Sequence, residues 1–154
     1  MLPTHTRYSH TPIGQRPVYD WPGGKRLAFY VCTNIEVFAL GQGDGALDNA
    51  VIGAKQTHRN YAWRDYGTRI GIWRLFDLLD ELGLRSAHNV NSLVYTMRPD
   101  IPRRIRARGD EVVAHGRTNA EHQDGLWEPD EARLIREVTA TIAQHEGRPP
   151  AGWL

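Results

Sequence analysis

EVVAHGRTNAEHQ, residues Glu111–Gln123, is the stretch from which the organisation of the whole chain can be worked out. Its apolar, β-branched start predicts a short strand over Glu111–Ala114, and His115 and Gly116 end that strand. Behind them follow three side chains able to bind a metal, a proton or a hydroxyl group: Asn119, Glu121 and His122. Such a loop after a strand is typical of a ligand site, although a capping or core histidine before a solvated loop gives the same pattern.

Two further strands are expected on the N-terminal side of this stretch. Leu27–Cys32 is a continuous apolar and aromatic run, which predicts a strand buried on both faces. Leu84–Val90 can form the next strand, and it becomes polar towards its end. Polar side chains follow both strands, at Thr33–Glu36 and at Asn91.

Helices are expected between the strands. Apolar residues at steps of three and four predict a helix from Tyr66 to Gly83, and Pro99 fits the first turn of a second helix that stops at Gly109. A third helix opens at Pro129 and closes at Gly147. Between the first strand and the first helix, the Gly- and Asn-rich residues 39–60 are expected to form a long loop.

Strands that alternate with helices predict an α/β fold of parallel βαβ units with right-handed crossovers. A fourth strand should begin near residues 151–153, so the sequence is expected to form part of a larger (β/α) barrel. In such sheets ligands bind at the carboxyl ends of the strands. This rule gathers six polar side chains at one edge: Asn34, Glu36, Asn89, Asn91, His115 and Asn119.

Length and charge limit the classes of partner. The chain has 154 residues, which suits a single domain, and its formal net charge is +1, from 19 basic and 18 acidic residues. So balanced a charge does not favour a nucleic acid or an acidic membrane as partner. The basic cluster Arg98–Arg108 is interpreted as the solvated face of a short helix.

Composition also limits the metal chemistry and the compartment. Cys32 is the only cysteine, so a metal would have to use His, Asp, Glu or Asn side chains. Residues 1–20 are polar and punctuated by proline, which predicts an extended arm ahead of a domain over residues 21–154. We find no signal peptide or membrane span in the sequence, and we expect a cytoplasmic protein.

Taken in order, five segments resemble the polysaccharide deacetylase (NodB-homology) family, near its branch of allantoinases and peptidoglycan deacetylase-like proteins. They are Trp21–Gly24, Asn34–Glu36, Asp65–Gly71, Val113–Gly116 and Arg148–Trp153, and the resemblance extends over residues 20–154. It implies a distorted (β/α) barrel that hydrolyses carbon–nitrogen bonds, typically of N-acetyl groups on sugars. It further implies that this chain is the N-terminal half of such a barrel, whose open edge pairs with another copy or with the missing C-terminal half.

The resemblance also assigns roles to residues. Glu36 stands where the family has its general base, and Val37 stands where the family has a metal-binding acid. His115 matches a metal-ligating histidine, and Asn119 replaces the second one. The resemblance thus implies Glu36 and His115 as catalytic residues and His115 with Asn119 as the remaining metal ligands. Zinc is possible as a cofactor, although this ligand set is degraded.

A mechanism with little or no metal remains open. Glu36, if the apolar residues around it raise its pKa, takes a proton from the attacking water, and His115 donates one to the oxyanion or the leaving nitrogen. Asn34, Asn89, Asn119 and Arg69 are the expected substrate-binding residues, for a small carbohydrate or a ureide. Alternatively, Glu36 pairs with an arginine, Arg69 pairs with an acid, and the chain is an inactive remnant or a carbohydrate-binding module.

Overall fold

A computed structural model describes residues 8–40 and 57–154 and shows a parallel sheet of three strands. They are β1 (Cys32–Ile35), β2 (Ala87–Val90) and β3 (Glu111–Ala114), in the spatial order β1-β2-β3. Cys32 pairs with Ala87, which in turn pairs with Glu111. A parallel bridge from Ala114 to Trp153 continues the sheet beyond β3, where a fourth strand was expected. The α/β class and the bounds of β3 are therefore as predicted from the sequence.

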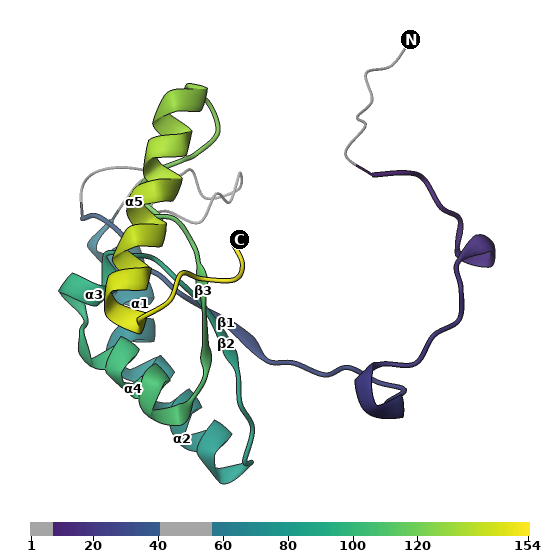
Figure 1. Cartoon of the computed structure of the whole chain (residues 1–154). Helices are drawn as coiled ribbons and strands as arrows, with labels where there is room; N and C mark the ends of the chain where they lie inside the picture. Colours follow the sequence, from purple (N-terminus) through teal and green to yellow (C-terminus); the bar gives the residue numbers. More distant parts are fainter. Residues whose placement is uncertain (1–7, 41–56) are drawn as a thin grey trace.

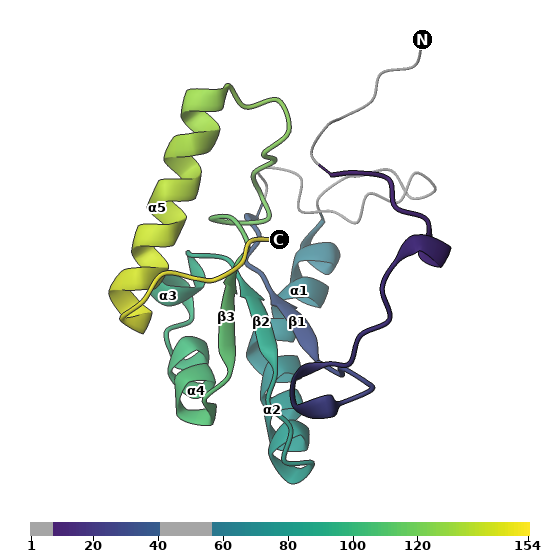
Figure 2. The same cartoon turned by 45° about the vertical axis from the view of Figure 1, so that its right-hand side comes forward.

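Apart from two short 3₁₀ helices on the N-terminal segment, η1 (Ile13–Gln15) and η2 (Pro22–Gly24), the helices of the described residues lie on one face of this sheet (Figures 1 and 2). They lie in the connections between neighbouring parallel strands, and such crossovers are as a rule right-handed, which puts successive helices on the same face. The opposite face carries no helix from the described part of the chain. The helical segments are α1 (His58–Tyr66), the π-helical segment η3 (Gly67–Gly71), α2 (Ile72–Glu81), α3 (Val94–Met97), α4 (Asp100–Arg108) and α5 (Glu128–Glu146).

The hydrophobic core fills the space between the sheet and the helices. On α2, Ile72, Phe76 and Leu79 recur at the spacing of one helix face, so all three side chains point at the sheet and are buried. Burial of each such side chain contributes about 1.5–3 kcal/mol. The helices α4 and α5 supply equivalent stripes: Ile101, Ile105, Leu134, Val138 and Ile142.

Glycines end the helices where the sequence predicts. Gly109 follows α4 with a φ of 71°, and Gly147 follows α5 with a φ of 74°. In this left-handed region a Cβ atom would be strained, which is why glycine closes these helices and lets the chain turn back towards the sheet. Gly83, after α2, is also left-handed, with a φ of 63°.

The predicted strand over Leu27–Cys32 is wrong. Only Cys32 of that run belongs to β1, while Leu27 and Phe29 are 78% and 72% exposed. The reason is the partner: the amide of Ala87 bonds to the carbonyl of Val31 at 2.9 Å, so pairing with β2 begins only there. An apolar run shows that a segment can be buried, but the neighbouring strand decides which residues are. For the same reason β2 begins at Ala87, later than the predicted Leu84.

The first helix also begins earlier than predicted. α1 starts at His58, and the hydroxyl of Thr57 caps it by accepting a hydrogen bond from the amide of Asn60 at 3.1 Å. α1, η3 and α2 then follow one another without a break. The short helix α3 was not predicted. Most of the loop expected over residues 39–60 lies outside the described residues, which leave out 41–56.

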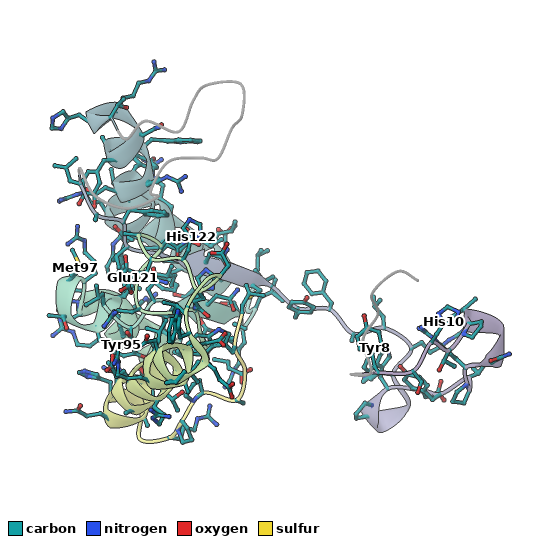
Figure 3. All side chains as sticks on the ribbon, turned by 90° about the horizontal axis from the view of Figure 1, so that it is seen from above. Tyr8, His10, Tyr95, Met97, Glu121 and His122 are labelled. Carbon is teal, nitrogen blue, oxygen red and sulfur yellow. The ribbon has the colours of Figure 1, made fainter. Side chains whose placement is uncertain are left out.

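Residues 8–30 are exposed throughout and lead away from the sheet (Figures 1 and 2). Figure 3 shows Tyr8 and His10 on this segment, apart from the body of the molecule that carries Tyr95. The expected turn at Trp21–Gly24 is present, and the amide of Trp21 bonds to the carbonyl of Lys25 at 2.7 Å. Among residues 8–40 and 57–154, none of the helices combines the length and hydropathy needed to cross a bilayer.

A buried polar network joins the amino ends of β2 and β3. Nε2 of His88 lies 2.8 Å from the hydroxyl of Ser86 and 3.1 Å from Asp110, and Nδ1 lies 2.6 Å from the hydroxyl of Thr33. Arg108 donates to Asp110 at 2.6 Å. Burial lowers the pKa of His88, and the neighbouring carboxylate of Asp110 offsets this only in part. Burial therefore favours the neutral form of His88, which serves as a structural residue at this end of the sheet.

The basic cluster Arg98–Arg108 is only partly the solvated face that was expected. Arg103 is exposed and pairs with Asp100, and Arg106 bonds to Glu146 at 2.8 Å. Arg108, in contrast, has a side chain that is only 3% exposed, and it pairs with two acids, Asp80 and Asp110. A helix face cannot be assigned as solvated from charge alone, because buried acids can take up an arginine.

Candidate functional site

An acid and an imidazole from different strands meet at the carboxyl end of the sheet. Glu36 is the first residue after β1, and His115 is the first residue after β3. Nε2 of His115 lies 3.1 Å from Oε1 of Glu36, and both side chains are partly buried. The parallel order β1-β2-β3 brings the two strand ends to the same edge, so the convergence expected from the sequence is confirmed.

Each partner shifts the pKa of the other. The hydrogen bond from His115 lowers the pKa of Glu36 against the opposing effect of burial, and Asn119 and the charge of Arg64 act in the same direction. The bond to Glu36 raises the pKa of His115, again against burial, and the carbonyl of Leu154, 2.9 Å from Nδ1, adds to it. Both ring nitrogens of His115 thus face oxygen acceptors, an arrangement that favours the imidazolium form beside a carboxylate. The condition set for a mechanism with little metal, that the apolar surroundings raise the pKa of Glu36, is not met, because the hydrogen bond from His115 outweighs the effect of burial.

Asn91 ties the strand ends together from the middle strand. Its side chain is fully buried, and its Oδ1 accepts a hydrogen bond from the amide of Val37 at 2.9 Å. Its Nδ2 donates to the carbonyl of His115 and to Oδ1 of Asn119, the latter at 3.1 Å. Asn91 therefore fixes the backbone on both sides of the pair. The sequence places it at the correct edge, but nothing in the pattern assigns it this bridging role.

Asn119 is held beside Glu36 by its loop. The amide of Asn119 bonds to the carbonyl of Val37 at 3.0 Å, and the hydroxyl of Thr118 bonds to the same carbonyl at 2.8 Å. The side chain of Asn119 also hydrogen-bonds to Glu36. One asparagine thus completes a cluster with the acid and the imidazole.

The other predicted site residues are placed in different ways. Asn89 donates to Asn34 at 2.8 Å, and both lie just before the strand ends, on the sheet face opposite the helices α1 to α5. Arg69 is exposed and pairs with Asp65. That acid also binds Arg98 at 2.9 Å.

Two further residues of the opening stretch lie on the loop after β3 (Figure 3). Glu121 accepts a hydrogen bond from Arg117 at 2.9 Å, and His122 lies 3.4 Å from Asp124. Both side chains are exposed, whereas those of Glu36 and His115 are partly buried.

The side chains at this edge do not fit a resident zinc ion. Zinc sites in proteins are built from at least three His, Cys, Asp or Glu ligands. Here the position of the expected acid holds Val37, whose side chain is apolar and buried, and Asn119 is neutral. Both ring nitrogens of His115 are already hydrogen-bonded. Within residues 8–40 and 57–154, no group of three such ligands is close enough to hold a metal.

A cavity of about 230 Å³ adjoins Glu36 at the free edge of β1. Asn34 and Glu36 line it from the strand, Arg64 lines it from α1, and Thr68 lines it from η3. Sequence reasoning missed Arg64, because the segment that carries it was expected to lie between a loop and the start of a helix. No signal in the sequence alone could have placed it beside Glu36.

No model of a known protein family matches the chain, and no curated protein matches its sequence. Solved structures, in contrast, do match the chain in fold. Puue allantoinase has a TM-score of 0.74 at 20% identity, over 97% of this chain and 53% of that structure. A probable polysaccharide deacetylase from Pseudomonas aeruginosa PAO1 has a TM-score of 0.72 at 23% identity, over 86% of this chain and 48% of that one.

A putative polysaccharide deacetylase from Mycobacterium smegmatis is also similar, with a TM-score of 0.58 at 22% identity, over 88% of this chain and 45% of that structure. The chain therefore spans about half the length of the solved proteins that it matches. At these identities the similarity concerns the fold. From its sheet order and from these neighbours, the chain has the fold shared by allantoinase and polysaccharide deacetylases, over about half of its extent.

Proposed function

We propose that this chain carries the acid–base pair of a hydrolase that cleaves carbon–nitrogen bonds other than peptide bonds. Candidate bonds are those of an N-acetyl group on a sugar or of a ureide. The observation that carries the proposal is the 3.1 Å contact between Glu36 and His115 at the carboxyl end of the sheet. In α/β proteins with parallel strands this edge is where substrates bind. The similar fold of an allantoinase and of polysaccharide deacetylases supports the same class of reaction.

The charge states of the pair suit a two-proton reaction. Glu36 is ionised, so its carboxylate accepts a proton from water as the water oxygen bonds to the carbonyl carbon. The raised pKa of His115 favours its charged form, whose Nε2–H hydrogen-bonds to the oxyanion and then passes its proton to the nitrogen as the carbon–nitrogen bond breaks. A lowered pKa makes Glu36 a weak base. The mechanism therefore depends on its position next to the water more than on its basicity.

Amide side chains beside the pair offer the substrate both donors and acceptors. Asn34, Asn89 and Asn119 are proposed to bind carbonyl or hydroxyl oxygens of the substrate. Arg69 is proposed to join them only if it exchanges its bond to Asp65 for one to the substrate. The helix-free sheet face is proposed to be one wall of a (β/α) barrel, completed by further strand–helix units or by another copy of the chain.

Release of acetate or ammonia tests the proposal. The full chain is incubated with N-acetylglucosamine oligomers and, separately, with ureides, with and without added zinc. We expect Glu36→Gln and His115→Gln each to lower the rate by about 10²- to 10⁴-fold, the usual contribution of a positioned acid or base. Glu121→Gln and His122→Gln, on the exposed loop after β3, serve as matched controls and should keep the rate. Equal rates in all five proteins would remove the catalytic assignment.

A second candidate is a carbohydrate-binding module without turnover. Val37 and Asn119 favour it, since they stand where the resemblance implies an acid and a histidine. Binding of the sugar oligomers, followed by titration calorimetry, with no acetate released would support this candidate over the hydrolase.

A further inference from the structure

The guanidinium of Arg64 lies next to Glu36, and the described residues do not use its hydrogen-bond donors. It lies in the last turn of α1, and its guanidinium carbon is 4.3 Å from the centre of the Phe38 ring. Its Nε is shielded from solvent and has no hydrogen-bond partner in residues 8–40 and 57–154. A buried donor without a partner costs about 1–3 kcal/mol, so a site that keeps one is suited to a ligand that satisfies it.

The cavity beside Glu36 gives such a ligand room. Its volume of about 230 Å³ is close to the size of a small organic molecule, and Arg64 and Phe38 form part of its wall. The π-helical turn η3 forms another part, where Gly67 and Gly71 leave the backbone bare. Single π-helical turns occur frequently at functional sites. A Cβ atom built on Gly67 would meet nothing within 4 Å, so this wall faces open space.

The charges around the cavity favour an anion. Glu36 is paired with His115, and within residues 8–40 and 57–154 no acid forms an ion pair with Arg64. Asp65, which follows Arg64 in the chain, is paired with two arginines, Arg69 and Arg98, and so adds no net negative charge. A guanidinium that packs over an aromatic ring can still bind a carboxylate through two parallel hydrogen bonds.

We infer that Arg64 and the cavity along β1 form a carboxylate subsite, so that the substrate is a small ureido or N-acyl acid whose carboxylate lies near its scissile carbon–nitrogen bond. This inference rests on the proposed function and narrows its substrate class. Arg64 holds the carboxylate, and the Glu36–His115 pair faces the acyl carbon. A neutral N-acetylated sugar leaves the donors of Arg64 unused and binds less well.

Two probes that differ only at the carboxylate test the subsite: N-carbamoylglycine and its neutral amide, N-carbamoylglycinamide. Binding is followed by titration calorimetry, and turnover is followed by ammonia release. The full chain should bind the acid at least about tenfold more tightly than the amide. Arg64→Met should weaken binding of the acid by about 10- to 100-fold and leave the amide unchanged, as expected for loss of charged hydrogen bonds. The affinity of Arg64→Lys for the acid should lie between those of the full chain and Arg64→Met, because lysine keeps the positive charge but cannot form two parallel hydrogen bonds.

Two further variants guard against a misfolded result. Gly67 has helical backbone angles, and a Cβ atom there would meet open space, so the Gly67→Leu variant should fold normally. Its side chain should fill the cavity and weaken binding of the acid. Arg59→Met removes an exposed arginine from the same helix, outside the cavity, and should change nothing.

The outcomes separate the subsite from the proposed reaction. Preference for the acid that depends on Arg64, without turnover, supports the subsite and counts against the hydrolase. Turnover with equal affinity for acid and amide, or equal losses in Arg64→Met for both probes, overturns the subsite and leaves the hydrolase standing. Absence of binding by both probes also overturns the subsite.

Discussion

Nε2 of His115 and Oε1 of Glu36 lie 3.1 Å apart, although the two residues are separated by 79 positions in the sequence. Two βαβ crossovers lie between them, and both crossovers return the chain to the same end of the sheet. The contact is therefore a product of the parallel topology and not of any local motif.

The first prediction concerns the protonation of this pair. In the full chain, the pKa of His115 should lie above its ordinary value of 6.5, because Glu36 stabilises the imidazolium. Glu36→Gln should bring it down again, and Glu121→Gln, on the exposed loop, should not. Proton and nitrogen NMR titration of the His115 ring measures this directly. An unchanged pKa in Glu36→Gln would contradict the ion pair.

The same pair should make stability depend on pH in a defined window. The raised pKa of His115 contributes stability below 6.5 that is lost as pH rises through its folded-state pKa. The lowered pKa of Glu36 contributes stability above 4.5 that is lost as pH falls through its folded-state pKa. The difference in unfolding free energy between the full chain and a Glu36→Gln, His115→Gln double variant should peak between these values. Urea denaturation at a series of pH values checks it.

His88 should act in the opposite direction, as an acid-labile residue. Burial lowers its pKa below 6.5, so below that pH the unfolded chain binds a proton that the folded chain does not. The stability of the full chain should thus fall as pH drops below 6.5, and His88→Gln should flatten this slope while lowering stability at neutral pH. His10→Gln, on the exposed arm, is the control and should keep the slope. Thermal denaturation at pH 7 and pH 5 distinguishes the two variants.

Asn91→Ala should be far more destabilising than a typical polar substitution. It removes the acceptor of the Val37 amide and the donor to the His115 carbonyl and to Asn119, all at a fully buried position. We expect a loss of about 2–4 kcal/mol in the free energy of unfolding. Asn89→Ala, which removes a bond to Asn34, should cost only about 1 kcal/mol. Similar losses in the two variants, measured by urea denaturation, would argue against Asn91 as the tie between strand ends.

Arg108→Met tests the buried polar network at the amino ends of β2 and β3. The guanidinium of Arg108 is almost fully buried and pairs with Asp110, so its removal leaves a buried carboxylate beside His88 with less compensation. Such a break costs about 3–5 kcal/mol. Arg103→Met, on the same helix, removes an exposed pair with Asp100 and should cost less than about 1 kcal/mol. The two midpoints of chemical denaturation give the comparison.

Local signals predicted the elements whose limits are set by backbone preference. Gly109 and Gly147 end their helices because only glycine adopts their left-handed angles without strain, and that property is visible in the sequence. The same holds for β3, whose β-branched run stops at a histidine and a glycine. The prediction of a strand over Leu27–Cys32 was wrong because burial depends on a neighbouring strand. Here β2 pairs with the first strand only from Val31 onward.

The sequence by itself determined the alternation of strands and helices, the edge at which polar residues gather, and the choice of Glu36 and His115 as candidates. Only the tertiary structure decided that the pKa of Glu36 is lowered, that Asn91 joins the strand ends, and that Arg64 lies beside a cavity at β1. The physical reason is the separation in sequence over which each interaction acts. Helix ends and strand patterns arise from neighbouring residues, whereas a pKa, a buried hydrogen bond or a cavity depends on which distant segments come into contact.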